Sequence, residues 1–73
     1  MIQSRDWQGN TLTLVNEVTG CAVQAGDVLE DFRGDPVTVT GGKAPHKPGS
    51  TGKVWTADGG EFYPSVVNCA WVL

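Results

Sequence analysis

The chain has 73 residues, of which 40% are hydrophobic, 10 are glycine and 4 are proline, and its formal net charge is −3. A chain of this length forms one small domain, which excludes a two-domain enzyme, a doubly wound nucleotide-binding fold and a long helical bundle. It has no apolar run near the roughly 18–20 residues of a membrane span and no signal-peptide pattern at its start, so we expect a cytoplasmic protein without a membrane segment.

Short strands separated by turns are predicted through the first half of the chain. Residues 11–15 alternate hydroxyl and apolar side chains, which is typical of a half-buried strand, and residues 21–24 are expected to pair back on them. Further strands are predicted over residues 28–32 and 36–40, the second of which is expected to end at a pair of glycines. The first 20 residues either add a strand or form a mobile arm tipped by Trp7.

The second half begins with a loop over residues 43–52. Residues 53–56 and 61–63 then flank an Ala-Asp-Gly-Gly sequence, which is a strong hairpin signal. Residues 64–68 begin with proline and suit one turn of 3₁₀ or α helix, and residues 70–73 return as a strand. The pattern predicts a mainly β fold: a small SH3-like barrel of about five short strands, with one 3₁₀ or helical turn before the last. We place this barrel in residues 26–73, preceded by an N-terminal arm or hairpin of residues 1–25.

The cysteines and aromatic residues guide the prediction of the core. Cys21 and Cys69 are expected to be reduced core residues, because both have apolar neighbours and small disulfide scaffolds usually carry several cystines. Three aromatic residues in or beside predicted strands are expected in the core: Trp55, Phe62 and Trp71. Tyr63 directly follows Phe62 and is therefore expected to face outwards.

No set of residues fits a catalytic, nucleotide or metal site. Lys53 ends a Gly-Ser-Thr-Gly-Lys sequence, but Val54 follows where a phosphate-binding loop needs Ser or Thr. The single histidine, His46, lies between prolines in a loop and has no orienting carboxylate beside it. Two distant cysteines and one histidine do not supply a zinc site. We expect a protein that is not an enzyme and that uses no cofactor or metal.

The charged residues are unevenly distributed. We call residues 27–35 the acidic edge, because they hold four acids and one base: Asp27, Glu30, Asp31, Asp35 and Arg33. We call residues 43–53 the basic loop, because they hold no acid and four basic side chains: Lys43, His46, Lys47 and Lys53. Each segment is either solvated surface or a face that meets a partner of opposite charge.

Residues 26–72 resemble a group of small bacteriophage and prophage proteins of unknown function. Four segments carry the resemblance: residues 31–35 (DFRGD), 45–54 (PHKPGSTGKV), 61–66 (EFYPSV) and 71–72 (WV). In size, acidity and lack of catalytic residues the chain is also similar to small phage transcription regulators. That similarity implies a non-enzymatic protein that binds host RNA polymerase at the N-terminal region of β′ near the RNA exit channel, inhibits initiation and promotes antitermination.

The expected contacts to this partner come from both charged segments and from the N-terminal region. The predicted contact residues are Arg5, Trp7, Asp27, Glu30, Asp31, Arg33, Lys43, His46, Lys47 and Lys53. We expect a monomer that binds polymerase in the host cytoplasm, with RNA as a possible second contact. Two alternatives remain open. Residues 49–54 resemble the Gly-x-Val turn of KOW-type SH3 barrels, which implies a nucleic-acid-binding module, and the size also suits a phage assembly or structural factor.

Overall fold

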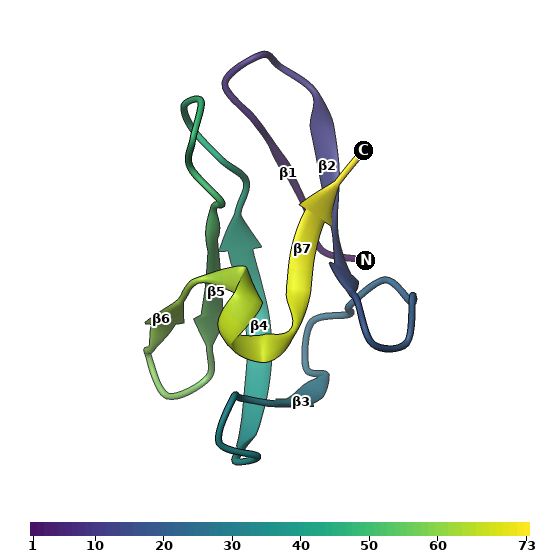
Figure 1. Ribbon diagram of the computed structural model, residues 1–73, viewed down its shortest axis with the longest axis vertical. Coiled ribbons are helices and arrows are strands. Elements are labelled where there is room, and N and C mark those ends of the chain that lie inside the picture. Colours follow the sequence, from purple (N-terminus) through teal and green to yellow (C-terminus); the bar gives the residue numbers. More distant parts are fainter.

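The computed structural model describes residues 1–73 as short strands joined by turns, with one 3₁₀ turn before the last strand (Figure 1). The elements are β1 (Gln3–Arg5), β2 (Thr11–Asn16), β3 (Val28–Glu30), β4 (Pro36–Lys43), β5 (Lys53–Thr56), β6 (Glu61–Phe62), η1 (Pro64–Val67) and β7 (Cys69–Val72). None of its helical segments has the length and apolar character needed to cross a membrane.

The strands form two antiparallel sheets, ordered β1-β2-β7 and β3-β4-β5-β6. In the first sheet β2 is central, with Leu12 opposite Ser4 of β1 and Leu14 opposite Trp71 of β7. In the second sheet the long strand β4 pairs with β3 through its first half and with β5 through its second half, across a register shift after Val39. The prediction of a mainly β fold is confirmed, and the strands are not hydrogen-bonded into one closed barrel.

The core lies between the two sheets and is built largely from alternate strand residues, as the period of two requires. Leu14, Val39 and Val54 have no exposed surface, and β2, β4 and β5 each contribute one of them. The first 25 residues supply Ile2 and Val23 as well as Leu14 to the same apolar cluster. Full burial of such a side chain stabilises the fold by about 1.5–3 kcal/mol, so residues from the N-terminal segment share in the stability of the whole chain.

The expected pairing of residues 21–24 with β2 is reduced to one bridge, between Val15 and Ala22. A tight turn precedes it, in which the backbone N–H of Gly20 donates to the carbonyl of Asn16. Val23 then turns into the core. Its N–H donates to Leu14 O at 2.9 Å, and its carbonyl accepts from the N–H of Ile2 at 3.1 Å. The segment therefore links the start of the chain to β2 instead of forming a hairpin strand.

Two predictions about the core are wrong. Trp55 is 43% exposed, because its neighbours Val54 and Thr56 take the two inward positions of β5. Its indole N–H donates to Glu61 Oε2 at 3.1 Å on the outer face of the sheet. Cys21 is exposed, because it lies at the end of the turn after β2, whereas Cys69 is buried and both thiols are free.

Candidate functional site

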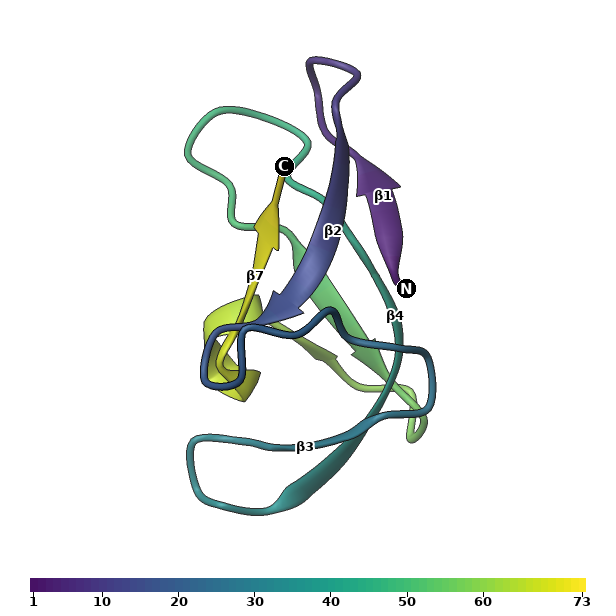
Figure 2. The same ribbon diagram turned by 90° about the vertical axis from the view of Figure 1, so that its right-hand side faces the viewer.

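The charged segments lie at opposite ends of a molecule that measures 33 × 22 × 18 Å. Figures 1 and 2 both place the β1–β2 turn and the β4–β5 loop at one end of the long axis and the β3–β4 turn at the other. The first end includes four of the five Lys and Arg residues and the only histidine: Arg5, Lys43, His46, Lys47 and Lys53. The second end includes most of the acidic edge. The fold therefore places most basic residues at one end of the molecule and most of the acidic edge at the other, although the two sets are close to each other along the chain.

The basic loop forms one wall of an open surface hollow of about 530 Å³, which we call the basic hollow. Its lining residues are His46, Lys47, Gly49, Ser50, Thr51, Lys53, Tyr63 and Ser65. No carboxylate is among them. The Lys53 ammonium lies 4.0 Å from the centre of the Tyr63 ring, which is a cation–π contact. The hollow thus offers cationic groups, hydroxyl groups and one aromatic ring to a ligand.

The base of the basic loop is fixed by Trp71 of β7. The Trp71 indole N–H donates to Lys53 O at 3.3 Å, and the ring lies against Gly42 and Gly52. A Cβ atom at Gly52 would lie 2.7 Å from Trp71 Cδ1 and 2.5 Å from Lys43 O. Gly52 also has a φ of +82°, a backbone conformation that residues other than glycine rarely adopt. The close approach of the ring to this hairpin therefore depends on glycine.

Strand β1 holds the other side of the loop. The backbone N–H of buried Ala44 donates to Ser4 Oγ at 3.0 Å, which joins the start of the loop to β1. Exposed Arg5 follows Ser4, and Trp7, which is 46% exposed, lies in the β1–β2 turn. The structure thus brings the predicted contact residues of the N-terminal segment to the same end as the basic loop.

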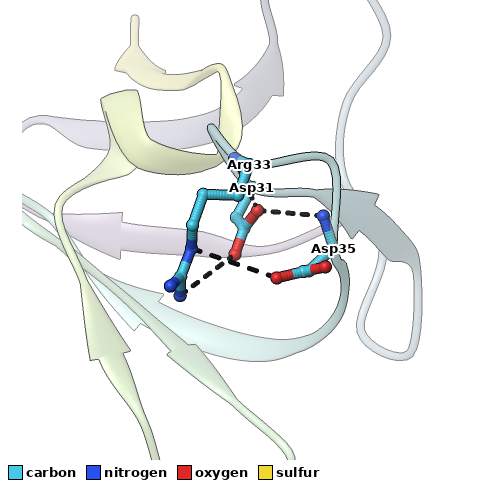
Figure 3. A network of polar contacts seen from close by, with 3 residues as sticks. All are labelled: Asp31, Arg33 and Asp35. Atoms are coloured by element: carbon cyan, nitrogen blue, oxygen red, sulfur yellow. Dashed lines mark hydrogen bonds and ion pairs between the residues drawn. The ribbon is translucent and has the colours of Figure 1, made fainter.

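The carboxylates of the acidic edge differ in what they bind. Asp31 is 8% exposed, and its Oδ1 accepts hydrogen bonds from the backbone N–H groups of Arg33 at 2.8 Å and Asp35 at 3.0 Å (Figure 3). Asp27 Oδ2 likewise accepts from the backbone N–H of Gln24 at 2.9 Å. Both side chains therefore stabilise turns. Glu30 and Asp35 remain as the exposed carboxylates of this segment.

Arg33 lies over this turn without a close ionic partner. Its guanidinium nitrogens are 4.0 Å from Asp31 and 3.9 Å from Asp35, and the side chains of Arg33 and Asp35 are both 68% exposed (Figure 3). Such ion pairs contribute little, at most about 1 kcal/mol. The guanidinium also lies 5.3 Å from the centre of the Phe32 ring, and Phe32 is 74% exposed. The acidic edge therefore presents an aromatic residue and an arginine to solvent.

Two ionisable groups have shifted pKa values, and neither lines the basic hollow. Hydrogen bonds from the Thr56 hydroxyl and the Gly60 backbone N–H lower the pKa of Asp58 in the β5–β6 turn. Burial raises the pKa of the Cys69 thiol from 9.0 to about 11, and the negative charge of Glu17 adds to the shift. Both shifts follow from local structure. No cluster of His, Cys, Asp and Glu side chains is arranged to hold a metal ion.

Sequence reasoning identified the basic side chains of the hollow but not its far wall. Tyr63 and Ser65 come from the segment around the start of η1 and meet the basic loop only in the folded chain. The one sequence signal for this wall was the prediction that the Tyr63 side chain faces outwards. No protein family, curated protein or solved structure matches the chain.

Proposed function

We propose that this chain is a phage-encoded, non-enzymatic SH3-like module that binds host RNA polymerase and regulates transcription. The observation that carries the proposal is the separation of an acidic edge with an exposed Phe32–Arg33 pair from a basic end with exposed Trp7. Aromatic residues and arginine are enriched where proteins contact one another. The resemblance to small phage proteins supplies the biological context.

The SH3-like assignment is supported by strand order. The first long strand, β2, pairs with the last, β7, while β4, β5 and β6 form a meander followed by η1. Strand β1 contacts β4, so the two sheets approach each other on that side. Strong bending of a long strand such as β4 lets a small number of strands enclose a core.

We assign polymerase binding to the acidic edge, at the N-terminal region of β′ near the RNA exit channel. A typical interface buries about 800 Å² on each partner, which is about a fifth of the 4451 Å² surface of this protein. Glu30 and Asp35 supply exposed negative charge for a basic patch on the partner. Phe32 and Arg33 supply an aromatic ring and a guanidinium, side chains that are enriched in protein interfaces. Occupying this site would inhibit initiation and promote antitermination without chemistry by the phage protein.

The test is capture of purified bacterial RNA polymerase core enzyme, taken from several bacterial classes, by the immobilised protein. We expect capture that weakens as salt rises, because charged faces contribute to it. The Phe32→Ala variant should lose capture, whereas the control Leu73→Ala, at a residue that is 90% exposed and lies outside the acidic edge, should retain it. Capture of no polymerase would overturn the proposal, and equal loss in both variants would overturn the assigned face.

The same preparations also test a role in phage assembly. A structural component is expected to self-associate, whereas the proposed regulator is expected to be a monomer. Light scattering of the purified protein measures this directly, and stable oligomers without polymerase binding would favour the assembly role.

A further inference from the structure

We propose that the basic hollow binds the phosphate backbone of a single-stranded nucleic acid. This inference goes beyond polymerase binding and does not rest on it, because the β4–β5 loop that lines most of the hollow and the β3–β4 turn of the acidic edge lie at opposite ends of the molecule (Figures 1 and 2). It gives a separate role to the basic loop. The ligand class follows from the charge, the hydroxyl groups and the aromatic ring that meet in the hollow.

The basic hollow holds a local excess of positive charge in an acidic protein. The chain has eight acidic residues and five basic ones, yet Lys47, Lys53 and His46 line a hollow that contains no carboxylate. Glu17 lines an adjoining depression together with Thr51 and Ser65. Phosphate groups are bound by lysines, hydroxyl groups and backbone N–H groups. The hollow supplies the first two in one place.

An exposed aromatic ring, that of Tyr63, lies at the rim of the hollow. Tyr63 is 57% exposed, and Lys53 covers part of its ring at 4.0 Å. Proteins that bind single strands combine a positive groove along the backbone with aromatic rings on which bases stack. A base would stack on the exposed part of Tyr63 while its phosphates lie between Lys47 and Lys53. A duplex hides its base faces, so this arrangement favours an unpaired strand.

Contacts within the protein hold the hollow in shape without a ligand. Trp71 fixes the base of the loop through its hydrogen bond to Lys53 O, and Ser4 holds Ala44 on the other side. Within the loop, Ser50 N–H donates to Lys47 O at 3.2 Å, and two prolines limit its conformations. A restrained loop loses less conformational entropy on binding than a flexible one.

The experiment is fluorescence anisotropy of a labelled single-stranded uridine oligonucleotide with the full-length protein. We expect saturable binding that weakens with salt at a log–log slope of about −1.5 to −2, as expected for two or three neutralised phosphates on a single strand. A duplex RNA of equal length should bind less tightly. Inorganic phosphate should compete only weakly, since it offers no base.

Matched charge variants locate the site. Lys47→Ala should weaken binding by about tenfold at low salt, whereas Arg33→Ala, which removes the same charge at the other end, should change it by less than about twofold. Tyr63→Leu should weaken binding and Tyr63→Phe should preserve it, because only the leucine lacks a ring for stacking. Thermal unfolding of each variant confirms that it is folded.

Several results would overturn the inference. These are no binding by the wild-type protein, equal effects of Lys47→Ala and Arg33→Ala, or equal affinity for an acidic peptide of the same charge. The last result would make the hollow a site for a protein. Failure here is separable from failure of polymerase binding, since Phe32→Ala is expected to lose polymerase and keep the oligonucleotide.

Discussion

At the residue scale, neighbouring carboxylates of the acidic edge have different functions. Asp31 is buried and accepts two backbone hydrogen bonds across the β3–β4 turn, whereas Asp35 is exposed and has only a long contact to Arg33. A buried acceptor that is removed leaves its donors without partners. The two residues are therefore a matched pair for separating a structural carboxylate from a surface one.

We predict that Asp31→Ala lowers the free energy of unfolding by about 1–3 kcal/mol, because two backbone N–H groups lose a charged acceptor. Asp31→Asn keeps one side-chain oxygen as an acceptor and should therefore lose less stability than Asp31→Ala. Asp35→Ala should change stability by less than about 0.5 kcal/mol. Urea denaturation followed by circular dichroism measures all three, and equal effects at both positions would contradict the role assigned to Asp31.

The buried thiol predicts a pH dependence. The pKa of Cys69 is raised from 9.0 to about 11 in the folded protein, so the folded state keeps its proton where the unfolded state loses it. The stability that the neutral thiol contributes is complete below pH 9 and is lost as the pH rises towards 11. The unfolding free energy of wild type relative to Cys69→Ala should therefore fall across this range. Urea titrations of the two proteins across this pH range measure the difference, and a constant difference would contradict a buried, neutral thiol.

At the element scale, the β4–β5 hairpin depends on glycine where Trp71 packs against it. Gly49 and Gly52 have nearly the same φ, +85° and +82°, but their surroundings differ. A Cβ atom at Gly49 would meet nothing within 4 Å, whereas one at Gly52 would meet Lys43 and Trp71. A side chain at either position is costly for the backbone. Only at Gly52 would it also push the ring away.

We predict that Gly49→Ala lowers the free energy of unfolding by about 1–2 kcal/mol, because alanine must adopt a left-handed backbone conformation there. Gly52→Ala should lower the free energy of unfolding by about 1–3 kcal/mol more than Gly49→Ala, since its methyl group is forced into a packed site. It should also reduce the near-ultraviolet circular dichroism of the tryptophans and weaken oligonucleotide binding. Equal unfolding midpoints for the two variants would show that the ring moves aside without cost.

The elements that the sequence predicted well are those decided by local chemistry. The hairpin around residues 57–60 and the 3₁₀ turn that begins at Pro64 both formed where expected, because their turn residues set the backbone directly. Strand β4 continued to Lys43 although two glycines were expected to end it at residue 40. Those glycines allow the rings of Trp55 and Trp71 to lie close to the backbone. Such a contact joins residues distant in the chain, so no local pattern indicates it.

In the candidate site, too, features set by the local sequence were predicted and contacts between distant residues were not. The cationic side chains of the basic loop were predicted because their charge is visible in the sequence. Tyr63 and Ser65 reached the hollow through the path of the chain around β5 and β6, which the sequence does not specify. The turn-forming roles of Asp27 and Asp31 were also missed. The sequence does not distinguish an acid whose side chain accepts a hydrogen bond from a nearby backbone N–H from an acid that faces solvent.

At the scale of the whole molecule, the two sheets share one core. Leu14 of β2 and Val54 of β5 are both fully buried and belong to one cluster with Ile2 and Val23, which like Leu14 come from the N-terminal segment. Backbone hydrogen bonds also connect Ile2, Leu14 and Val23. A chain built in this way is expected to unfold as one unit, with residues 1–25 and 26–73 losing structure together.

We predict that Leu14→Ala lowers the unfolding free energy by about 2–5 kcal/mol, because it removes buried methyl groups and leaves a cavity. The stability of a domain of this size is about 4–11 kcal/mol, so the variant remains folded only if the wild type is in the upper part of that range. Val54→Ala provides a milder replacement in the other sheet. Amide hydrogen exchange measured by NMR should accelerate to a similar extent in β2 and in β5 for either variant, since both exchange through global unfolding. The control Leu73→Ala, at a residue that is 90% exposed, should leave exchange unchanged. Acceleration confined to β1, β2 and β7 in Leu14→Ala would instead mean that the two sheets unfold separately.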